Sequence, residues 1–245
     1  MRSHKSISTR NCWIIITLAA TWTHTSWAAG FSAKGYELKP SASAAQPLLF
    51  TLDNTRTGET GTTVFKDSKG RELIEEKMRY DPQGALVEYE IHHRQRALRG
   101  KIEVRSDKLI FTRVDEKGKS STEQENLPVT WAVGPTLIPL LQKNWATILK
   151  GEKLRIRFAV WDRKETVGFD LFKDSVQPGG DGKDHVIVKM KPTSFIIAAI
   201  VDPIYFTLPL DGSRLEEMKG RTLPMIERDG KLRDLDAWIV YQNTP

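Results

Sequence analysis

Residue types that carry out chemistry are sparse in this chain. After Ala28 its histidines are His92, His93 and His185. His92 and His93 are adjacent, so on a strand their side chains would point to opposite faces and would not bind one metal ion together. The sequence has neither the zinc motif H-E-x-x-H nor the serine-hydrolase elbow G-x-S-x-G. We therefore predict no metal, no cofactor and no catalytic residue. A triad of distant residues stays open, because triads are defined by geometry.

The segment Gly179–Lys183 has three glycines and a lysine, a composition that phosphate-binding loops share. It departs from the Walker motif because Gln177 stands at the position of the first glycine, and Asp184 replaces the Ser or Thr that should follow the lysine. Acidic side chains here would also repel phosphate. We interpret this segment as a hairpin loop.

Glu76 is the polar residue with the most informative position. Alternating polar and apolar residues predict a hairpin that turns at Asp81–Gly84 and carries Met78, Tyr89 and Ile91 on its apolar face. Glu76 falls on that face, opposite Tyr89. An inward carboxylate costs several kcal/mol unless it is paired or neutralised. Glu76 is therefore either the polar anchor of a ligand pocket or part of an open or slipped sheet face that reaches water.

Two hairpins follow in detail from this alternation. In the first, the four-residue turn places Lys77 opposite Glu88 on the polar face. In the second, a turn at Asp162–Glu165 places Arg157 opposite Asp170. One face of each hairpin is apolar, as in antiparallel sheets that face water on one side. The apolar face of the second hairpin carries Leu154, Ile156, Phe158, Val160, Val167, Phe169 and Leu171.

The hairpins belong to a longer series of short alternating segments separated by turn signals. The segments fall at residues 47–53, 59–66, 71–80, 85–95, 98–105, 108–114, 152–161, 166–174, 184–191, 203–210, 213–219 and 233–241. This spacing predicts an antiparallel meander in the form of a barrel, a half-barrel or a sandwich. We predict a mainly β fold, in which the meander forms a half-barrel or barrel-like sheet with one or two apolar helices on its concave face.

Two segments depart from the strand pattern. The first, Thr136–Lys150, repeats apolar residues at 137, 141, 145 and 148, which is the spacing of a helix. With Thr136 as the N-cap, Pro139 stands in the first turn, where proline is tolerated, and Gly151 ends the helix. We expect Trp145 to anchor this helix in the core.

The second segment, Phe195–Val201, lies between Pro192 and Pro203 and is either one to two turns of helix or a strand. Both segments fit plain core packing, and both fit the wall or lid of an apolar cavity. A cavity would bind a lipid or another apolar small molecule. Its predicted lining is Glu76, Met78, Tyr89, Ile91, Leu141, Trp145 and Phe195.

The N-terminal residues follow the three-part order of a secretory signal peptide. Arg2, Lys5 and Arg10 make a basic start. The apolar run Cys12–Ala20 is too short to span a bilayer as an ordinary helix, which needs about 20 apolar residues. Small residues at 26 and 28 then form a cleavage site. We predict a signal peptide at residues 1–28, with an uncleaved N-terminal anchor as the alternative.

Cleavage after Ala28 would change the charge and chemistry of the protein. Its net charge would fall from +6 to +3, because three basic residues leave. No run of about five or six like charges remains, so nucleic acid and an anionic membrane surface are weak partner candidates. We expect no nucleic acid partner, and separately no membrane span in the mature chain. The sole cysteine also leaves, which excludes disulfides and thiol chemistry. We predict a mobile lead-in at residues 29–46 and a single β-rich domain at residues 47–245.

From the N-terminus, the predicted parts of the chain are thus a signal peptide, a strand meander, a Trp-bearing helix and more antiparallel strands. The tail has an apolar stretch, a Pro-containing strand and a closing strand, at Phe195–Val201, Asp202–Pro209 and Asp236–Tyr241. In this order it resembles exported bacterial half-barrel proteins, best known from the lipoprotein carriers of the outer-membrane sorting pathway and similar to some uncharacterised exported families. The resemblance covers most of residues 47–241 and implies a fold and a periplasmic or secreted location, while fold does not imply function.

Three hypotheses for the function follow. The first is a periplasmic protein that binds or carries a lipid or another apolar ligand, which an internal cavity would favour. The second is a non-enzymatic assembly or scaffold protein of the cell envelope with an envelope-protein partner, which a solid core and a large exposed apolar patch would favour. The third is a hydrolase without a recognisable motif, which polar groups with shifted pKa values in a cleft would favour.

Overall fold

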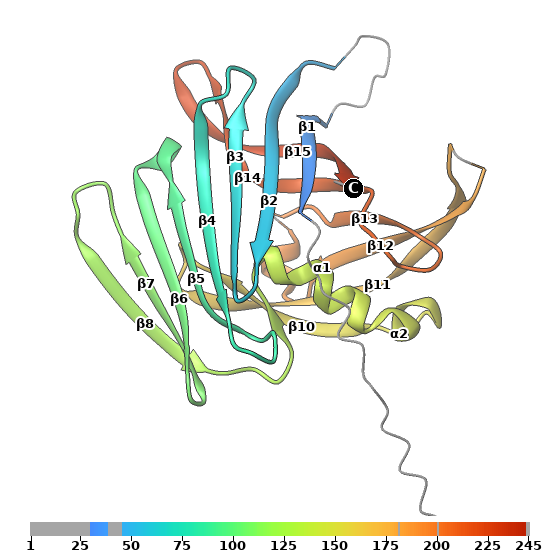
Figure 1. The fold of residues 1–245 in the computed structure, drawn as a ribbon, viewed down its shortest axis with the longest axis horizontal. Coiled ribbons are helices and arrows are strands. Elements are labelled where there is room, and N and C mark those ends of the chain that lie inside the picture. The colour runs from blue at the N-terminus through green and yellow to red at the C-terminus, as the bar shows by residue number, and fades with distance from the viewer. Residues whose placement is uncertain (1–29, 39–45, 181, 200, 244–245) are drawn as a thin grey trace, which may run out of the picture.

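The computed structural model describes residues 30–38, 46–180, 182–199 and 201–243. Within these residues fifteen strands form one sheet that curls around its own inner face (Figure 1). Neighbouring strands are antiparallel except for β9 and β10, which are parallel. The strands are β1 Phe31–Glu37, β2 Leu48–Thr57, β3 Thr60–Asp67, β4 Glu72–Tyr80, β5 Leu86–His93, β6 Leu98–Arg105, β7 Lys108–Val114, β8 Ser120–Asn126, β9 Trp131–Ala132, β10 Leu154–Val160, β11 Glu165–Pro178, β12 Asp184–Pro192, β13 Ile204–Pro209, β14 Glu217–Arg228 and β15 Lys231–Asn243. The predicted mainly β, antiparallel, barrel-like fold is confirmed.

Strand β1 joins two arms of the sheet. It lies between β2 and β15, so one arm runs from β2 to β8 and the other runs from β15 back to β9. The expected mobile lead-in is therefore wrong for residues 31–37. The small residues that suggested mobility are needed for packing: Ala33 is buried, and a Cβ on Gly35 would lie 2.2 Å from the Phe50 ring. The ring of Phe50 packs directly on the β1 backbone.

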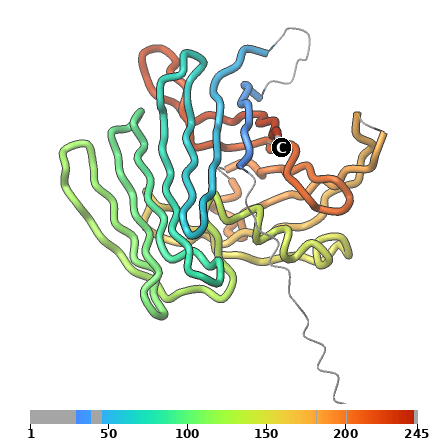
Figure 2. The backbone as a smooth tube through the Cα atoms, in the orientation of Figure 1, coloured from blue at the N-terminus to red at the C-terminus, as the bar shows by residue number. Residues whose placement is uncertain are grey.

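The two arms stand across from each other, the first in blue to green and the second in yellow to red (Figure 2). They meet where β8 approaches the start of β11. There the Glu125 carboxylate accepts hydrogen bonds from Thr166, at 3.1 Å from its backbone nitrogen and 2.6 Å from its hydroxyl. Lys164 reaches Glu123 at 3.3 Å. Side chains rather than a strand ladder therefore connect these edges.

The interior of the first arm is filled by the turn between β10 and β11. Trp161 in this turn is buried, and a Cβ on Gly100 of β6 would lie 2.3 Å from its ring. Next to it, Arg96 donates a 2.7 Å hydrogen bond to Asp162. Glycine at position 100 is thus required by the close approach of the indole ring rather than by backbone conformation.

The predicted helix packs on the inner face of the second arm, but it is two helices: α1 Gly134–Lys143 and α2 Trp145–Leu149. Its predicted apolar stripe is buried throughout, at Leu137, Leu141, Trp145 and Ile148. The start and the break differ from the prediction. Val133 is the N-cap, so Pro139 stands inside the helix, and Asn144 interrupts it while its side chain donates to the Leu140 carbonyl at 2.8 Å.

Both predicted hairpins form, each with its pairing shifted by two residues. Lys77 lies opposite Glu90 rather than Glu88, because the turn is one residue longer and β4 bulges after Arg79. In the second hairpin Arg155, not Arg157, lies opposite Asp170. A shift of two keeps every side chain on its predicted face, since the strand period is two.

Among its described residues, the segment Phe195–Val201 contains one short helix, α3 Phe195–Ala198. The prediction that this segment packs in the core is wrong for its first two residues, because Phe195 is 88% exposed and Ile196 is 76% exposed. The described part of the chain contains no helix long and apolar enough to cross a membrane. The predicted signal peptide lies outside the described residues.

Candidate ligand-binding site

The predicted polar anchor Glu76 is inside the protein. Its side chain is 3% exposed, and the Tyr89 hydroxyl donates a 2.7 Å hydrogen bond to its Oε1. The Cα partner of Glu76 is Ile91, so the contact with Tyr89 is diagonal across β4 and β5. Burial raises the pKa of Glu76 from its ordinary 4.5 to about 7, and the Tyr89 hydrogen bond limits the rise. The carboxyl group can therefore hold a proton at neutral pH.

Two other elements approach Glu76. A Cβ on Gly134, the first residue of α1, would lie 3.5 Å from Oε1, so the helix N-terminus lies beside the carboxyl group. A helix N-terminus carries partial positive charge and favours a carboxylate. Burial and then Glu76 raise the pKa of Tyr241 on β15. The Glu76 carboxyl group on β4 thus bonds to β5 and lies beside α1, and its charge also acts on Tyr241 of β15.

The seven residues predicted to line one cavity are divided among three places. Glu76, Met78, Tyr89 and Ile91 belong to the buried cluster inside the first arm. Leu141 and Trp145 belong to a second buried cluster under the helices. Phe195 is on the surface. The structure therefore brings four of the seven together and separates them from the other three.

The Trp145 side chain packs closely against the residues around it. Its indole nitrogen donates a 3.0 Å hydrogen bond to the Leu210 carbonyl. A Cβ on Gly212 would lie 2.5 Å from the indole ring, which packs against the loop between β13 and β14. The predicted role of Trp145 as a core anchor agrees with this burial.

A surface groove of about 470 Å³ lies between β2–β4 and the β14–β15 hairpin. We call its apolar side chains, of which Phe50, Leu73 and Leu235 are buried, the floor, and its charged side chains, such as the exposed Arg71 and Glu72, the rim. The apolar lining is Leu49, Phe50, Leu73, Pro224, Met225, Ile226, Leu232 and Leu235, and the polar lining is Asp67, Arg71, Glu72, Arg94, Gln95 and Glu227. This volume lies within the roughly 300–1,000 Å³ of ordinary ligand sites.

β14 forms one wall of the groove, because hydrogen bonds hold it against the open end of the first arm. The Gln95 amide donates to the Met225 carbonyl at 2.8 Å and accepts from the Met225 backbone nitrogen at 3.0 Å. Next to it, Nε2 of the buried His93 lies 3.1 Å from the Leu223 carbonyl. Burial lowers the pKa of His93, so the ring is neutral and donates from Nε2 at neutral pH. The Gln95 side-chain amide thus forms with Met225 the pair of hydrogen bonds that the backbone of a neighbouring strand would otherwise form.

Ion pairs hold the rim. Arg94 contacts Glu72 at 2.8 Å, and Arg71 contacts Asp67 at 3.1 Å. Hydrogen bonds from the backbone of Arg71 lower the pKa of Asp67. The rim therefore presents fixed charges of both signs above an apolar floor.

Sequence reasoning missed this groove because its two walls are distant along the chain. Gln95 and Met225 are 130 residues apart, and the β14–β15 hairpin was predicted only in part. A local signal for the hairpin was present: Asp229-Gly230 is a dipeptide typical of two-residue turns, and both residues have positive φ. The contact across the mouth of the arm left no pattern in the sequence.

No family model matches the chain, and no curated protein matches it. Among solved structures it is similar to a crystal structure described as a beta-barrel-like protein of domain of unknown function DUF1849 from Brucella abortus. The TM-score is 0.55 at 11% sequence identity, over 89% of this chain and 96% of that chain. At this identity the likeness shows the fold alone. The chain therefore has a β-barrel-like fold, and the comparison does not point to lipoprotein carriers in particular.

Proposed function

We propose that this is an exported, non-catalytic binding protein that holds an amphipathic small molecule, such as a lipid, in the groove between β2–β4 and the β14–β15 hairpin. The observation that carries the proposal is the apolar floor under a charged rim. Export is supported by the signal-peptide order at residues 1–28. The ligand class is the one expected from the sequence, while the groove contains none of the seven residues that were expected to line the site.

The floor of the groove suits an aliphatic chain. Its side chains come from both walls, so an acyl chain lying there would contact β2, β4, β14 and β15 at once. Each buried CH₂ group would contribute about 0.8 kcal/mol. Several such groups are enough for micromolar binding once the cost of association is met.

The rim favours a head group without strong net charge. The guanidinium groups of Arg71 and Arg94 lie among three carboxylates, those of Asp67, Glu72 and Glu227, so charges of both signs are present with one acid in excess. An anionic head would meet three carboxylates, and a cationic head would meet two guanidinium groups already paired with acids. A zwitterionic or uncharged polar head can use both signs.

Binding of a dansyl-labelled fatty acid, competed by lysophosphatidylcholine, tests the proposal. We expect saturable binding that Leu232→Trp weakens by about ten-fold, because the indole would occupy the space of about two CH₂ groups. Val176→Trp is the matched control, since Val176 is also exposed but lies on β11, outside the groove. Equal binding by both variants, or no saturable binding, would overturn the proposal.

The second candidate is a non-enzymatic scaffold of the cell envelope. It is favoured by the tight interior, where Phe50 and Trp161 each pack on a glycine backbone. A protein that fails to bind any amphiphile but co-purifies with one envelope protein would favour this candidate. The two functions are separable because a scaffold would bind its partner equally well after Leu232→Trp.

A further inference from the structure

Lysine and aromatic residues alternate along one row on the outer face of the second arm, up to a final pair of aromatic residues. From Phe172 onward each member is the cross-strand partner of the next, and Lys153 lies over the Phe172 ring. In order it runs Lys153, just before β10, then Phe172, Lys189, Tyr205, Lys219, Trp238 and Tyr36. These side chains lie on the solvent face, because their neighbours in sequence such as Leu171, Met190 and Phe206 are buried.

Each lysine of the row lies over the ring on the next strand. The ammonium group is 5.7 Å from the ring centre for Lys153 and Phe172, and 5.2 Å for Lys189 and Tyr205. It is 5.8 Å for Lys219 and Trp238. Each of the three ammonium groups therefore lies within the distance of about 6 Å at which an aromatic ring attracts a cation. Strands are spaced by about 4.8 Å, so lysines on every second strand recur about every 10 Å.

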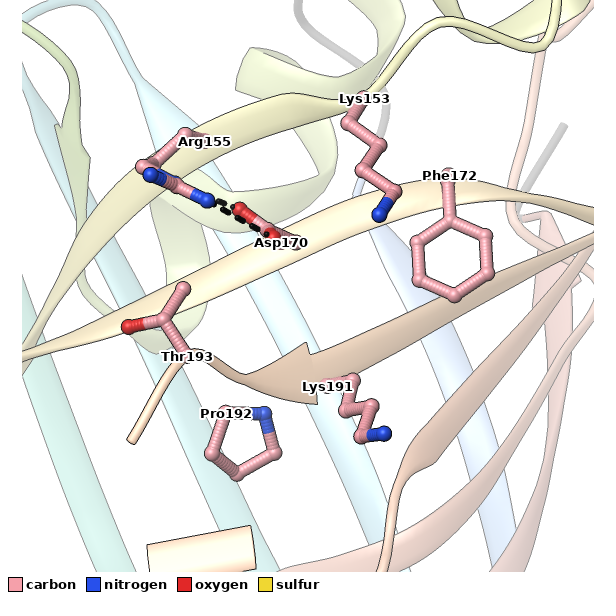
Figure 3. A pocket seen from close by; sticks show the side chains of 7 residues that line it. All are labelled: Lys153, Arg155, Asp170, Phe172, Lys191, Pro192 and Thr193. Carbon is pink, nitrogen blue, oxygen red and sulfur yellow. Dashed lines mark hydrogen bonds and ion pairs between the residues drawn. The ribbon is translucent and has the colours of Figure 1, made fainter. Parts of the chain in front are cut away.

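A shallow pocket of about 250 Å³ lies at the β10–β12 end of the row. Figure 3 shows Lys153 and Phe172 on one side of it and Lys191, Pro192 and Thr193 on the other. Asp170 stands between them and receives two hydrogen bonds from Arg155, at 2.8 and 3.1 Å. The pocket thus presents Lys153, Lys191, the Thr193 hydroxyl and a carboxylate that is paired with Arg155.

Acceptors are interleaved with these cations along the rest of the row. Glu217 lies 3.0 Å from Lys219, and Asp174 lies 3.9 Å from Lys189. Such a surface suits a ligand that has both anionic groups and hydroxyl donors. A chain of acidic sugars has both in every unit, whereas the phosphodiester backbone of DNA only accepts hydrogen bonds.

We propose that this row binds a linear anionic glycan, with one acidic sugar in the pocket beside Phe172 and further anionic groups on Lys189 and Lys219. The strands that carry the row belong to one curled sheet (Figure 1), and the outer face of a curled sheet is a shape that a flexible polymer follows and a flat bilayer does not. Stacked bases would need open ring faces, and here each of three rings already carries an ammonium group. The site is on a different face from the groove and does not depend on the proposed function.

Calorimetric titration of the full protein with polygalacturonate oligomers tests the proposal. We expect saturable, salt-sensitive binding, and no binding of uncharged cellulose oligomers. The double variant Lys189→Gln/Lys219→Gln should weaken binding by about ten-fold, since it removes two hydrogen bonds to charged groups whose strength partial exposure reduces. Lys189→Arg/Lys219→Arg, which keeps both charges, should bind within about two-fold of the original protein, on the same scale of free energy.

The matched control is Lys77→Gln/Lys101→Gln, which removes the same charge from the outer face of the first arm. Its binding should be unchanged, and circular dichroism verifies that each variant is folded. An equal loss in this control would show general charge attraction and overturn the proposal. Binding only to phosphatidylglycerol vesicles, only to oligo-dT, or to none of the probes would overturn it as well.

Discussion

Tyr89 donates a 2.7 Å hydrogen bond to the carboxyl group of Glu76 in the closed interior of the first arm. Both side chains are almost fully buried, at 1% and 3% exposed. A carboxyl group in this position is costly when ionised, and one neutral donor replaces only part of its lost hydration. The pair therefore makes the stability of the fold depend on pH.

Glu76→Gln should change that dependence. Because the pKa of Glu76 is raised in the folded chain, the folded protein holds the proton more tightly, and stability falls as the pH rises from 4.5 to about 7. The glutamine variant lacks this loss, so its free energy of unfolding relative to the original protein should rise by about 3 kcal/mol across the window. Urea unfolding at several pH values measures the difference. Glu90→Gln on the neighbouring exposed face is the control, and the same pH profile for Glu76→Gln and the original protein would refute the prediction.

Trp145→Ala should lower the free energy of unfolding by about 3–5 kcal/mol, the usual cost of removing a large aromatic side chain from a core. Trp145→Phe keeps most of the ring and loses the hydrogen bond to the Leu210 carbonyl. Its cost from that bond should be about 1 kcal/mol. Chemical denaturation of both variants compares the two losses. A small effect of Trp145→Ala would mean that the helices contribute little to the core.

Gly212→Ala should be more harmful than Gly118→Ala. Both glycines have positive φ, at 67° and 79°, so each substitution meets the same backbone strain of about 1 kcal/mol. Only at Gly212 would the new methyl group also collide with the Trp145 ring, while nothing lies within 4 Å of the methyl group at Gly118. Overpacking adds about 1–3 kcal/mol. Equal losses in thermal unfolding would contradict the packing of Trp145 on this loop.

Asp162→Asn should weaken the insertion of the β10–β11 turn into the first arm. The ion pair with Arg96 is partly buried, so we expect a loss of about 1–2 kcal/mol. Arg163 and Glu165 form an exposed pair in the same turn, at 2.7 Å. Glu165→Gln should cost under about 1 kcal/mol, as exposed pairs do. If the two variants unfold at the same denaturant concentration, the turn is not held by Asp162.

The exported protein should lack residues 1–28. Its basic start, short apolar run and small residues at 26 and 28 predict signal-peptidase cleavage after Ala28. Mass spectrometry of protein recovered from the periplasm of an expressing bacterium measures the new N-terminus. Ala28→Arg should block cleavage, because a bulky charge does not fit a small-residue position. An exported chain that keeps Met1 would favour the N-terminal anchor instead.

Local pattern was sufficient for most of the strands and for the buried side of the helices. Alternation placed Glu76 and Tyr89 on an inward face, and the spacing of Leu137, Leu141, Trp145 and Ile148 gave the stripe that is buried. These predictions survived a two-residue error in each hairpin, because side-chain direction depends only on whether a shift is odd or even. Turn length and the bulge after Arg79, which set the actual partners, involve single residues whose effect a pattern does not show.

Contacts between distant parts of the chain were decided by the tertiary structure alone. The Ala- and Gly-containing β1 has a weak strand pattern, and it is a strand because β2 and β15 pair with it and Phe50 packs on Gly35. Trp161 packs on Gly100, 61 positions away, inside the first arm. Gln95 forms hydrogen bonds with Met225 of β14, 130 positions away, at the open end of that arm. The alternating lysines and aromatics of the outer row lie on separate strands from β10 to β1. Their order exists only in the direction across the sheet, where the register rather than the sequence sets which residues are neighbours.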